Sequence, residues 1–172
     1  DLDVLPFPPR KHPFDDYPGI PITNILSSRG CTRNCSFCSI AAWHRLCGGD
    51  RLRLRAPEHL ADEMALLYGQ GVRIFNFHDD NFVLDDKVAM LERMHALRSA
   101  LAARNVTAPI AFAIKCRPDV VDAEVFELLR EMGMFRVFLG LEAGTAESLR
   151  RLGRGQTVED NLRALEILGG LE

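Results

Sequence analysis

The sequence lacks the features that mark membrane, secreted and nucleic-acid-binding proteins. It has no uncharged apolar run near the roughly 18–20 residues that a membrane helix needs. No segment joins a basic end to an apolar middle, as a signal peptide does. Neither sign of charge dominates, because 21 Lys and Arg stand against 24 Asp and Glu, for a net charge of −3. A chain this near neutrality carries no general basic field for nucleic acid or anionic lipid.

What is present fits one globular domain. The 172 residues correspond to one domain at roughly 100–200 residues per domain. An apolar content of 47% with 26% charged residues excludes a disordered tail, a collagen-like fibre and a mucin-like stalk. Residues 1–20 differ, because they are rich in proline and lack periodicity, which predicts a linker. We interpret residues 21–172 as the domain, and expect another domain upstream of Asp1.

The five cysteines are unevenly spaced. An odd number without a signal peptide argues against a disulfide framework and predicts a reducing, cytoplasmic setting. Three of them fall within eight residues, in the order Cys31-Thr-Arg-Asn-Cys35-Ser-Phe-Cys38. This spacing indicates a set of metal ligands rather than chance. Cys47 and Cys116 are interpreted as a loop thiol and a partly buried thiol, both inert.

The number of clustered thiols bears on the kind of metal site. Structural zinc is normally held by four ligands, whereas three thiolates suit a cubane iron–sulfur cluster that keeps one iron open. The pattern therefore favours an iron–sulfur cluster. Two alternatives stay open. One is a non-catalytic zinc-binding α/β module with Cys47 or His44 as fourth ligand. The other is an iron–sulfur electron carrier closed by a fourth cysteine.

Strand-like and helix-like segments alternate along the rest of the chain. Strands are predicted at 22–26, 72–77, 110–114 and 135–139, and helices at 57–68, 85–104, 122–132, 146–152 and 158–168. Such alternation with short connections predicts an α/β fold with about four parallel βα units. Four units cannot close a standard barrel. We expect either an incomplete (β/α) barrel or further strands beyond Glu172.

The periodicity also predicts packing details. Asp85 is expected to cap the long helix, and the buried face of that helix is expected to carry Val88, Leu91, Met94, Leu97 and Leu101. Alternation within the strands places five aromatic residues in the core: Phe75, Phe77, Phe112, Phe135 and Phe138. A basic group at a helix end is interpreted as solvated, with a phosphate contact as the alternative: Arg150, Arg151 and Arg154.

Unusual polar residues follow each predicted strand. The three clustered cysteines follow the first strand, Asp79 and Asp80 the second, Arg117 the third and Glu142 the fourth. In parallel barrels the chemistry lies at the carboxyl ends of the strands. These residues are therefore predicted to form one site. His78 is interpreted as a hydrogen-bonded loop histidine.

The motif Cys-x-x-x-Cys-x-x-Cys, with Phe37 before the last cysteine, resembles the signature of radical S-adenosylmethionine (SAM) enzymes. The resemblance implies a partial (β/α) barrel and a [4Fe–4S] cluster held by Cys31, Cys35 and Cys38, with Phe37 beside the cofactor. It implies that SAM chelates the fourth iron and that the reduced cluster cleaves SAM to methionine and a 5′-deoxyadenosyl radical. A reductant protein such as flavodoxin or ferredoxin is the expected partner, and the substrate cannot be read from the sequence.

Two further segments carry the resemblance. Asp79-Asp80-Asn81-Phe82 resembles an Asp-Asp-x-Phe loop near the SAM amino group, although a simple turn is the alternative for both aspartates. Residues 140–144, Gly-Leu-Glu-Ala-Gly, resemble a Gly-Leu-Glu-Ser-Gly segment that implies a SAM contact for Glu142, with alanine in place of the usual serine. Arg117 matches an arginine that reaches the SAM carboxylate or pairs with Glu142 or an aspartate.

The Pro-rich entry and the Ser27–Cys31 segment resemble the join between a cobalamin-binding domain and a radical SAM barrel. Such proteins methylate unreactive carbon or build rings. The resemblance implies cobalamin held by a domain outside this chain, and a fragment that is inactive alone. The rival within the superfamily is a tRNA methylthiotransferase.

Overall fold

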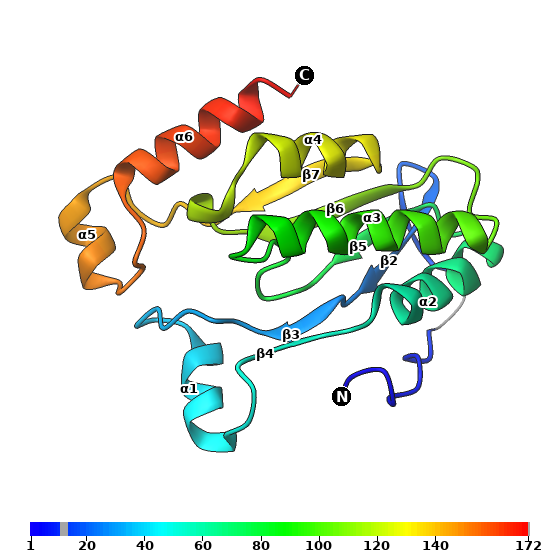
Figure 1. The fold of residues 1–172 in the computed structure, drawn as a ribbon, viewed down its shortest axis with the longest axis horizontal. Helices are drawn as coiled ribbons and strands as arrows, with labels where there is room; N and C mark the ends of the chain where they lie inside the picture. The colour runs from blue at the N-terminus through cyan, green and yellow to red at the C-terminus, as the bar shows by residue number, and fades with distance from the viewer. Residues whose placement is uncertain (11–13, 172) are drawn as a thin grey trace.

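The fold is an α/β layer structure built on one curved sheet (Figure 1). The computed structural model describes residues 1–10 and 14–171. Four strands of the sheet run parallel, in the spatial order β2 (Ile20–Ile25), β5 (Ile74–Phe77), β6 (Ala111–Cys116) and β7 (Met134–Leu139). The mostly parallel sheet confirms the predicted fold class, and no closed barrel is formed by the described residues.

One edge of the sheet comes from the segment predicted as a linker. β1 (Asp15–Tyr17) pairs antiparallel with β2, with Tyr17 opposite Ile20. The Tyr17 ring also contacts Phe135 of β7, at a ring distance of 6.0 Å, although β7 lies at the other edge of the sheet. The sheet is therefore strongly curled where its parallel strands begin.

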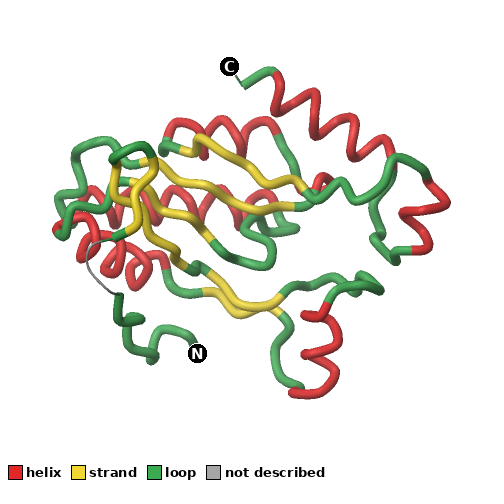
Figure 2. Tube along the Cα trace, turned by 180° about the vertical axis from the view of Figure 1, so that it is seen from behind, coloured by secondary structure: helices red, strands yellow, loops and turns green. Residues whose placement is uncertain are grey.

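The helices cover one face of this sheet. α2 (Pro57–Gly69), α3 (Lys87–Ala103) and α4 (Ala123–Glu131) lie in front of the strands in Figure 1, and the sheet is seen uncovered from behind in Figure 2. A short 3-10 turn, η1 (Pro118–Val120), and the helix α6 (Val158–Gly169) pack beside α4, whereas α5 (Ala146–Arg151) lies beyond the ends of the strands in Figure 1. None of the described helices has the length and apolar character needed to span a membrane.

The hydrophobic core lies between the strands and these helices. It buries large side chains from β5, β6, α2, α3 and α4: Phe75, Phe77, Phe112, Ile114, Leu60, Met64, Met90, Met94, Phe126 and Leu129. The N-cap of α3 is Asp86, whose side chain accepts from Ala89 N, so the prediction of Asp85 was wrong by one position. Val88 is correspondingly 63% exposed, and Met90 takes a buried place on that helix.

Phe75, Phe77 and Phe112 are buried as predicted, but Phe135 and Phe138 are not. These two residues are 45% and 69% exposed on β7. β7 is an edge strand within the described part of the chain, and the sheet face opposite the helices is left open there. Alternation in the sequence shows that successive residues point to opposite faces, but it does not show whether both faces are covered.

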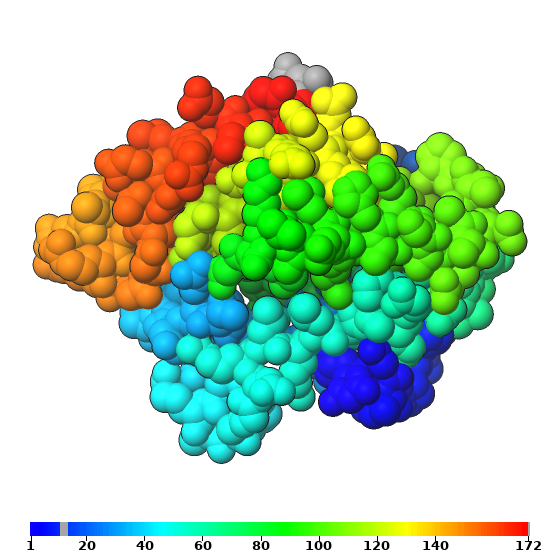
Figure 3. Space-filling view, viewed as in Figure 1, coloured from blue at the N-terminus to red at the C-terminus, as the bar shows by residue number. Residues whose placement is uncertain are grey.

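A small second layer carries the cysteines. β3 (Ser28–Gly30) and β4 (Leu52–Leu54) form a two-stranded antiparallel ribbon, and α1 (Ser39–Cys47) projects from the body between them (Figures 1 and 3). The helix α1 was not predicted. Cys47 ends α1 and is exposed, rather than lying in a loop.

Candidate functional site

The cysteine loop starts at a glycine that no other residue could replace without strain. Gly30 has φ +95°, and a Cβ there would lie 2.0 Å from the carbonyl oxygen of Arg51. Its backbone N–H donates to Oδ2 of Asp80 at 3.0 Å. At the far side of the loop, Ser36 N donates to Leu152 O at 2.9 Å. The loop is therefore held between the exit of β5 and the end of α5.

Two buried arginines converge on the middle cysteine. Nη1 of Arg117 and Nη1 of Arg154 each lie 3.5 Å from Sγ of Cys35, and all three residues are less than 9% exposed. Arg117 is also paired with Asp119, at 2.8 Å and 2.9 Å. Two guanidinium groups beside one sulfur favour an anionic ligand at this position.

Arg154 is the functional residue that the sequence analysis misjudged. It was predicted to be solvated with Arg150 and Arg151, but it is buried and also donates to Gly140 O at 2.6 Å and Gln156 Oε1 at 2.8 Å. The residues around Arg154 in the sequence gave no signal of its burial, because Arg154 reaches the cysteines only where the chain turns back after α5. Arg150 and Arg151 are exposed as predicted.

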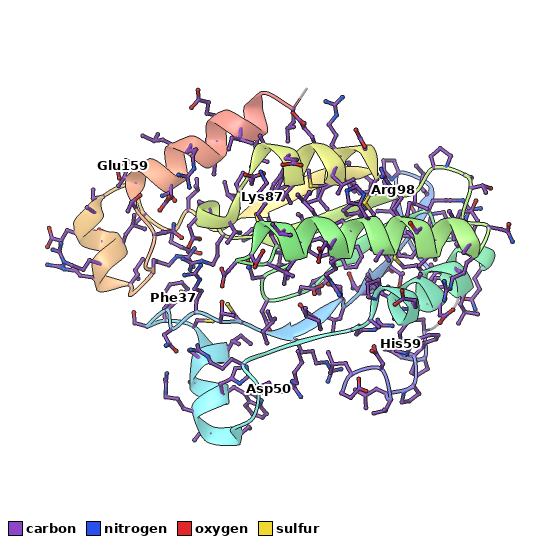
Figure 4. All side chains as sticks on the ribbon, viewed as in Figure 1. Phe37, Asp50, His59, Lys87, Arg98 and Glu159 are labelled. Atoms are coloured by element: carbon purple, nitrogen blue, oxygen red, sulfur yellow. The ribbon has the colours of Figure 1, made fainter. Side chains whose placement is uncertain are left out.

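The other two cysteines lie at the rim of the same region. Cys31 and Cys38 are half-buried, and Cys38 occupies the N-cap position of α1, where the helix dipole stabilises negative charge. Burial is the main cause that raises the pKa of Cys31, while the backbone N–H of Arg33 and the charge of Arg117 oppose it. Phe37 is 53% exposed and lies on the loop before α1 (Figure 4), with the Arg154 guanidinium 6.0 Å from its ring centre.

The Asp79-to-Phe82 segment joins three strand exits. Asp79 is fully buried and accepts from the backbone and side chain of Ser27 and from the Ser28 hydroxyl. Burial raises the pKa of Asp79, although the bonds from both serines oppose this. Its position is internal, which agrees with the turn alternative more than with a SAM contact. Asp80, by contrast, is exposed.

The last two residues of this segment reach the third strand. Asn81 Oδ1 accepts from Arg117 N at 3.1 Å, and Phe82 N donates to Lys115 O at 2.9 Å. The Phe82 ring packs against Phe77, with ring centres 4.8 Å apart. The segment therefore fixes the position of Arg117 relative to the cysteine loop.

Glu142 has a strained backbone at the exit of β7. Its φ is +63°, and Ala143 N donates to Leu141 O across it at 2.7 Å, which closes a γ-turn of a rare and strained kind. Its Oε1 lies 3.9 Å from Nη1 of Arg154. A Cβ on Gly140 would lie 3.1 Å from both the Arg154 and Glu142 side chains, so glycine leaves room for this pair. Glu142 thus pairs with Arg154, not with Arg117.

The site contains buried donors that lack an acceptor. Among the described residues, the buried side-chain nitrogen and oxygen atoms without a hydrogen-bond partner are Arg33 Nε and Arg154 Nε. Unpaired buried donors are costly, and an iron–sulfur cluster or a SAM carboxylate would supply acceptors. No three His, Cys, Asp or Glu side chains in residues 1–10 and 14–171 gather closely enough to hold a single metal ion. Thiolates of a cubane cluster bind different irons, so the cysteine set and its arginines fit a cluster.

The geometry agrees with the comparison against protein families, in which residues 25–171 match the radical SAM superfamily. The chain belongs to the radical SAM superfamily. Members of this superfamily use a [4Fe–4S] cluster and SAM. The radical SAM match covers every strand exit described above.

Curated relatives of this radical SAM chain include methyltransferases and a cyclase. An uncharacterized methyltransferase of Pyrococcus horikoshii is 28% identical over 96% of the chain and 35% of the relative. The hopanoid C-3 methylase of Methylococcus capsulatus is 29% identical over 88% of the chain and 27% of the relative. The anaerobic magnesium-protoporphyrin IX monomethyl ester cyclase of Synechocystis is 26% identical over 90% of the chain and 29% of the relative. The chain spans about a third of these relatives or less.

Solved structures of cobalamin-dependent radical SAM enzymes share the fold. OxsB with aqua-cobalamin and SAM bound has a TM-score of 0.67 at 20% identity, covering 86% of this chain and 22% of that one. The methyltransferase TsrM from Kitasatospora setae has a TM-score of 0.68 at 24% identity, covering 87% and 28%. At 20–24% sequence identity, these structures show that the fold is shared.

Proposed function

We propose that this chain is the cluster-binding and SAM-binding part of a cobalamin-dependent radical SAM methyltransferase. The observation that carries the proposal is the pair of buried arginines on Cys35, one of which has an unpaired Nε beside the thiols. Such a pair suits an anionic cluster rather than an inert thiol. When bound, the cluster supplies the electron for SAM cleavage, which no side chain here could supply.

The residues at the strand exits have distinct tasks in this proposal. Cys31, Cys35 and Cys38 hold the cluster, and Phe37 shields its outer side. Arg117 and Arg154 stabilise the sulfur charge and exclude water from it. Glu142 and Asp80 are the exposed carboxylates that would accept from the SAM amino group. Asp79 is a positioning residue, since it holds Ser27 and Ser28 ahead of the cysteine loop.

Methyl transfer is favoured among the radical SAM reactions by the names of the relatives. Those of Pyrococcus horikoshii and Methylococcus capsulatus are called a methyltransferase and a methylase, and cobalamin is bound in the solved structure of OxsB. In this proposal cobalamin is held outside residues 1–172, and the acceptor is left open. The unpaired thiols of the described residues favour a reducing compartment such as the cytoplasm.

The proposal is tested by anaerobic reconstitution with iron and sulfide, followed by electron paramagnetic resonance of the reduced protein with and without SAM. We expect a [4Fe–4S] signal that changes when SAM is added. Cys35→Ala should abolish it, whereas Cys47→Ala should retain it. Loss in Cys47→Ala would favour a cluster or zinc site closed by four ligands. A colourless protein that folds only with zinc would refute the assignment as a radical SAM enzyme.

A basic surface beside the cluster loop suits the electron donor that radical SAM enzymes generally need. Residues 29–55 contain six arginines and one acidic residue, Asp50, although the whole chain has a net charge of −3. Three of these arginines are exposed: Arg29, Arg45 and Arg53. On α1, whose N-cap is Cys38, Trp43 is 64% exposed and Leu46 is 83% exposed, with Arg45 between them also exposed. We propose that an acidic carrier, flavodoxin or ferredoxin, docks here, because charge complementarity guides such encounters.

This docking is tested by reducing the reconstituted protein with flavodoxin and, separately, with dithionite. Arg45→Glu should slow the flavodoxin reaction several-fold and make it less sensitive to salt, because it removes positive charge from the docking surface. The dithionite reaction should be unchanged. Equal slowing of both reactions would place the fault in the cluster and would contradict the docking surface.

A further inference from the structure

A cavity lies apart from the cysteine loop, where the N-terminal segment packs beside β2. Its volume is about 270 Å³, just below the roughly 300–1,000 Å³ that ligand pockets occupy. Figure 3 shows the N-terminal segment in blue, packed against the body of the protein beneath α2. Apolar residues form most of the cavity wall: Leu2, Leu5, Pro6, Phe7, Pro8, Ile25 and Leu26.

The inner end of the cavity holds a carboxylate that is shared by two cations. The carboxylate of Glu63 lies between two arginines, at 2.6 Å from Nη2 of Arg10 and 2.5 Å from Nη1 of Arg55. Arg10 also donates to the carbonyl of Asn24 on the open edge of β2, at 3.0 Å. Because one carboxylate serves two guanidinium groups, this end holds the wall together and keeps an excess of positive charge, so it repels no anion.

The other end carries positive charge without a counterion. Arg29 lines the cavity and is exposed, and its side chain makes no hydrogen bond or ion pair with any described residue. Its direct cross-strand partner in the ribbon is Arg53. Like charges directly opposite on adjacent strands destabilise a sheet. A sequence that keeps such a pair beside a cavity points to an anion that offsets the repulsion.

Polar side chains on the open sheet face continue the cavity at the end where Arg29 lies. His78 lines the cavity, and its ring nitrogens lie 3.1 Å from Nζ of Lys115 and 2.9 Å from Nδ2 of Asn76. Asn76 is in turn 3.0 Å from the side chain of Asn24, another cavity residue. Burial and the charge of Lys115 lower the pKa of His78, so the positive charge there belongs to Lys115.

We propose that this cavity binds an organic anion, with an apolar body between the N-terminal segment and β2 and an acidic group at Arg29 and the His78–Lys115 pair. The proposal goes beyond the radical SAM assignment. It uses none of the cysteines and needs neither cluster nor SAM. Its result is therefore independent of the paramagnetic resonance test described above.

The probe is anilinonaphthalene sulfonate, which joins an aromatic body to one fixed negative charge and fluoresces when bound in an apolar site. Its uncharged counterpart, N-phenylnaphthylamine, serves as the comparison. The wild-type chain should bind both. Arg29→Gln should weaken the sulfonate roughly tenfold, the effect of losing one charged hydrogen bond, and leave the neutral probe unchanged. Arg29→Lys should recover most of the sulfonate affinity.

Arg45→Gln is the matched control, because Arg45 is an exposed arginine of the same basic region that does not line the cavity. It should leave both affinities unchanged. The proposal is refuted if the wild-type chain binds neither probe, or if Arg29→Gln has no effect. It is also refuted if Arg45→Gln weakens the sulfonate equally, or if the neutral probe weakens in parallel. Those last two results would show nonspecific attraction or a structural fault.

Discussion

Arg154 and Cys35 are 119 positions apart in the chain, and Nη1 of the one lies 3.5 Å from Sγ of the other. The contact crosses from the end of α5 to the middle of the cysteine loop. It places a buried guanidinium group beside Cys35, the least exposed of the three clustered cysteines. The Nε of Arg154 is left without an acceptor.

Arg154→Gln should therefore lower both the iron content and the midpoint potential of the reconstituted protein, because hydrogen bonds to cluster sulfur stabilise the reduced state. Iron and sulfide analysis and a spectroscopic redox titration measure the two quantities. Arg150→Gln, at an exposed position of the same segment, is the control and should match the wild-type protein. A normal potential in Arg154→Gln would mean that Arg154 serves only to pack the loop.

Glu142→Gly should stabilise the chain while weakening SAM binding. The left-handed backbone at φ +63° costs a non-glycine residue about 1 kcal/mol, which glycine avoids. Thermal melting should show the gain, and SAM titration the loss of a carboxylate. Asn105→Gly relieves the same kind of backbone, at φ +59°, and should leave SAM affinity intact. Unchanged SAM affinity in Glu142→Gly would remove Glu142 from the site.

Asp79→Asn should change how stability depends on pH. Burial raises the pKa of Asp79 in the folded chain, so the folded state holds this proton more tightly than the unfolded state does. The stabilisation of the folded chain by this bound proton is complete below the pKa that Asp79 has in the unfolded state. It is lost as pH rises through the pKa that Asp79 has in the folded state. As pH rises above about 4, the ordinary pKa of an aspartate, the free energy of unfolding should fall less steeply in Asp79→Asn than in wild type.

Urea titrations at several pH values measure this slope. Asp15→Asn, at an exposed position of β1, is the control and should keep the wild-type slope. Identical slopes in all three proteins would show that Asp79 keeps its ordinary pKa.

Gly30→Ala should unfold the start of the cysteine loop, where β3 ends. Its methyl group would lie 2.0 Å from the Arg51 carbonyl, a backbone atom that cannot move aside cheaply. Gly49→Ala adds a methyl group in open space at a similar backbone angle, φ +83°, and should cost only about 1–2 kcal/mol. Denaturation curves and iron content should separate the two variants. Equal stability would mean that the β3–β4 ribbon adjusts freely.

The sequence predicted local structure well where a short-range signal exists. Asp122 begins the helix predicted over 122–132 and caps α4, because an aspartate before an apolar helical stretch satisfies free backbone N–H groups. The alternation of strands and helices predicted four parallel strands, since short connections permit few other arrangements. The helix α1 was missed, and Cys47 at its end was interpreted as a loop thiol.

By itself, the sequence determined the metal-ligand motif, the parallel α/β fold and the placing of polar residues at one end of the strands, all of which depend on neighbours in the chain. Only the tertiary structure decided which of those residues meet. It buried Asp79 against Ser27, assigned Glu142 to Arg154 rather than Arg117, and brought Arg154 to Cys35. It also left Phe138 uncovered. Burial and pairing of this kind depend on contacts between distant segments, and no local pattern in a single sequence records them.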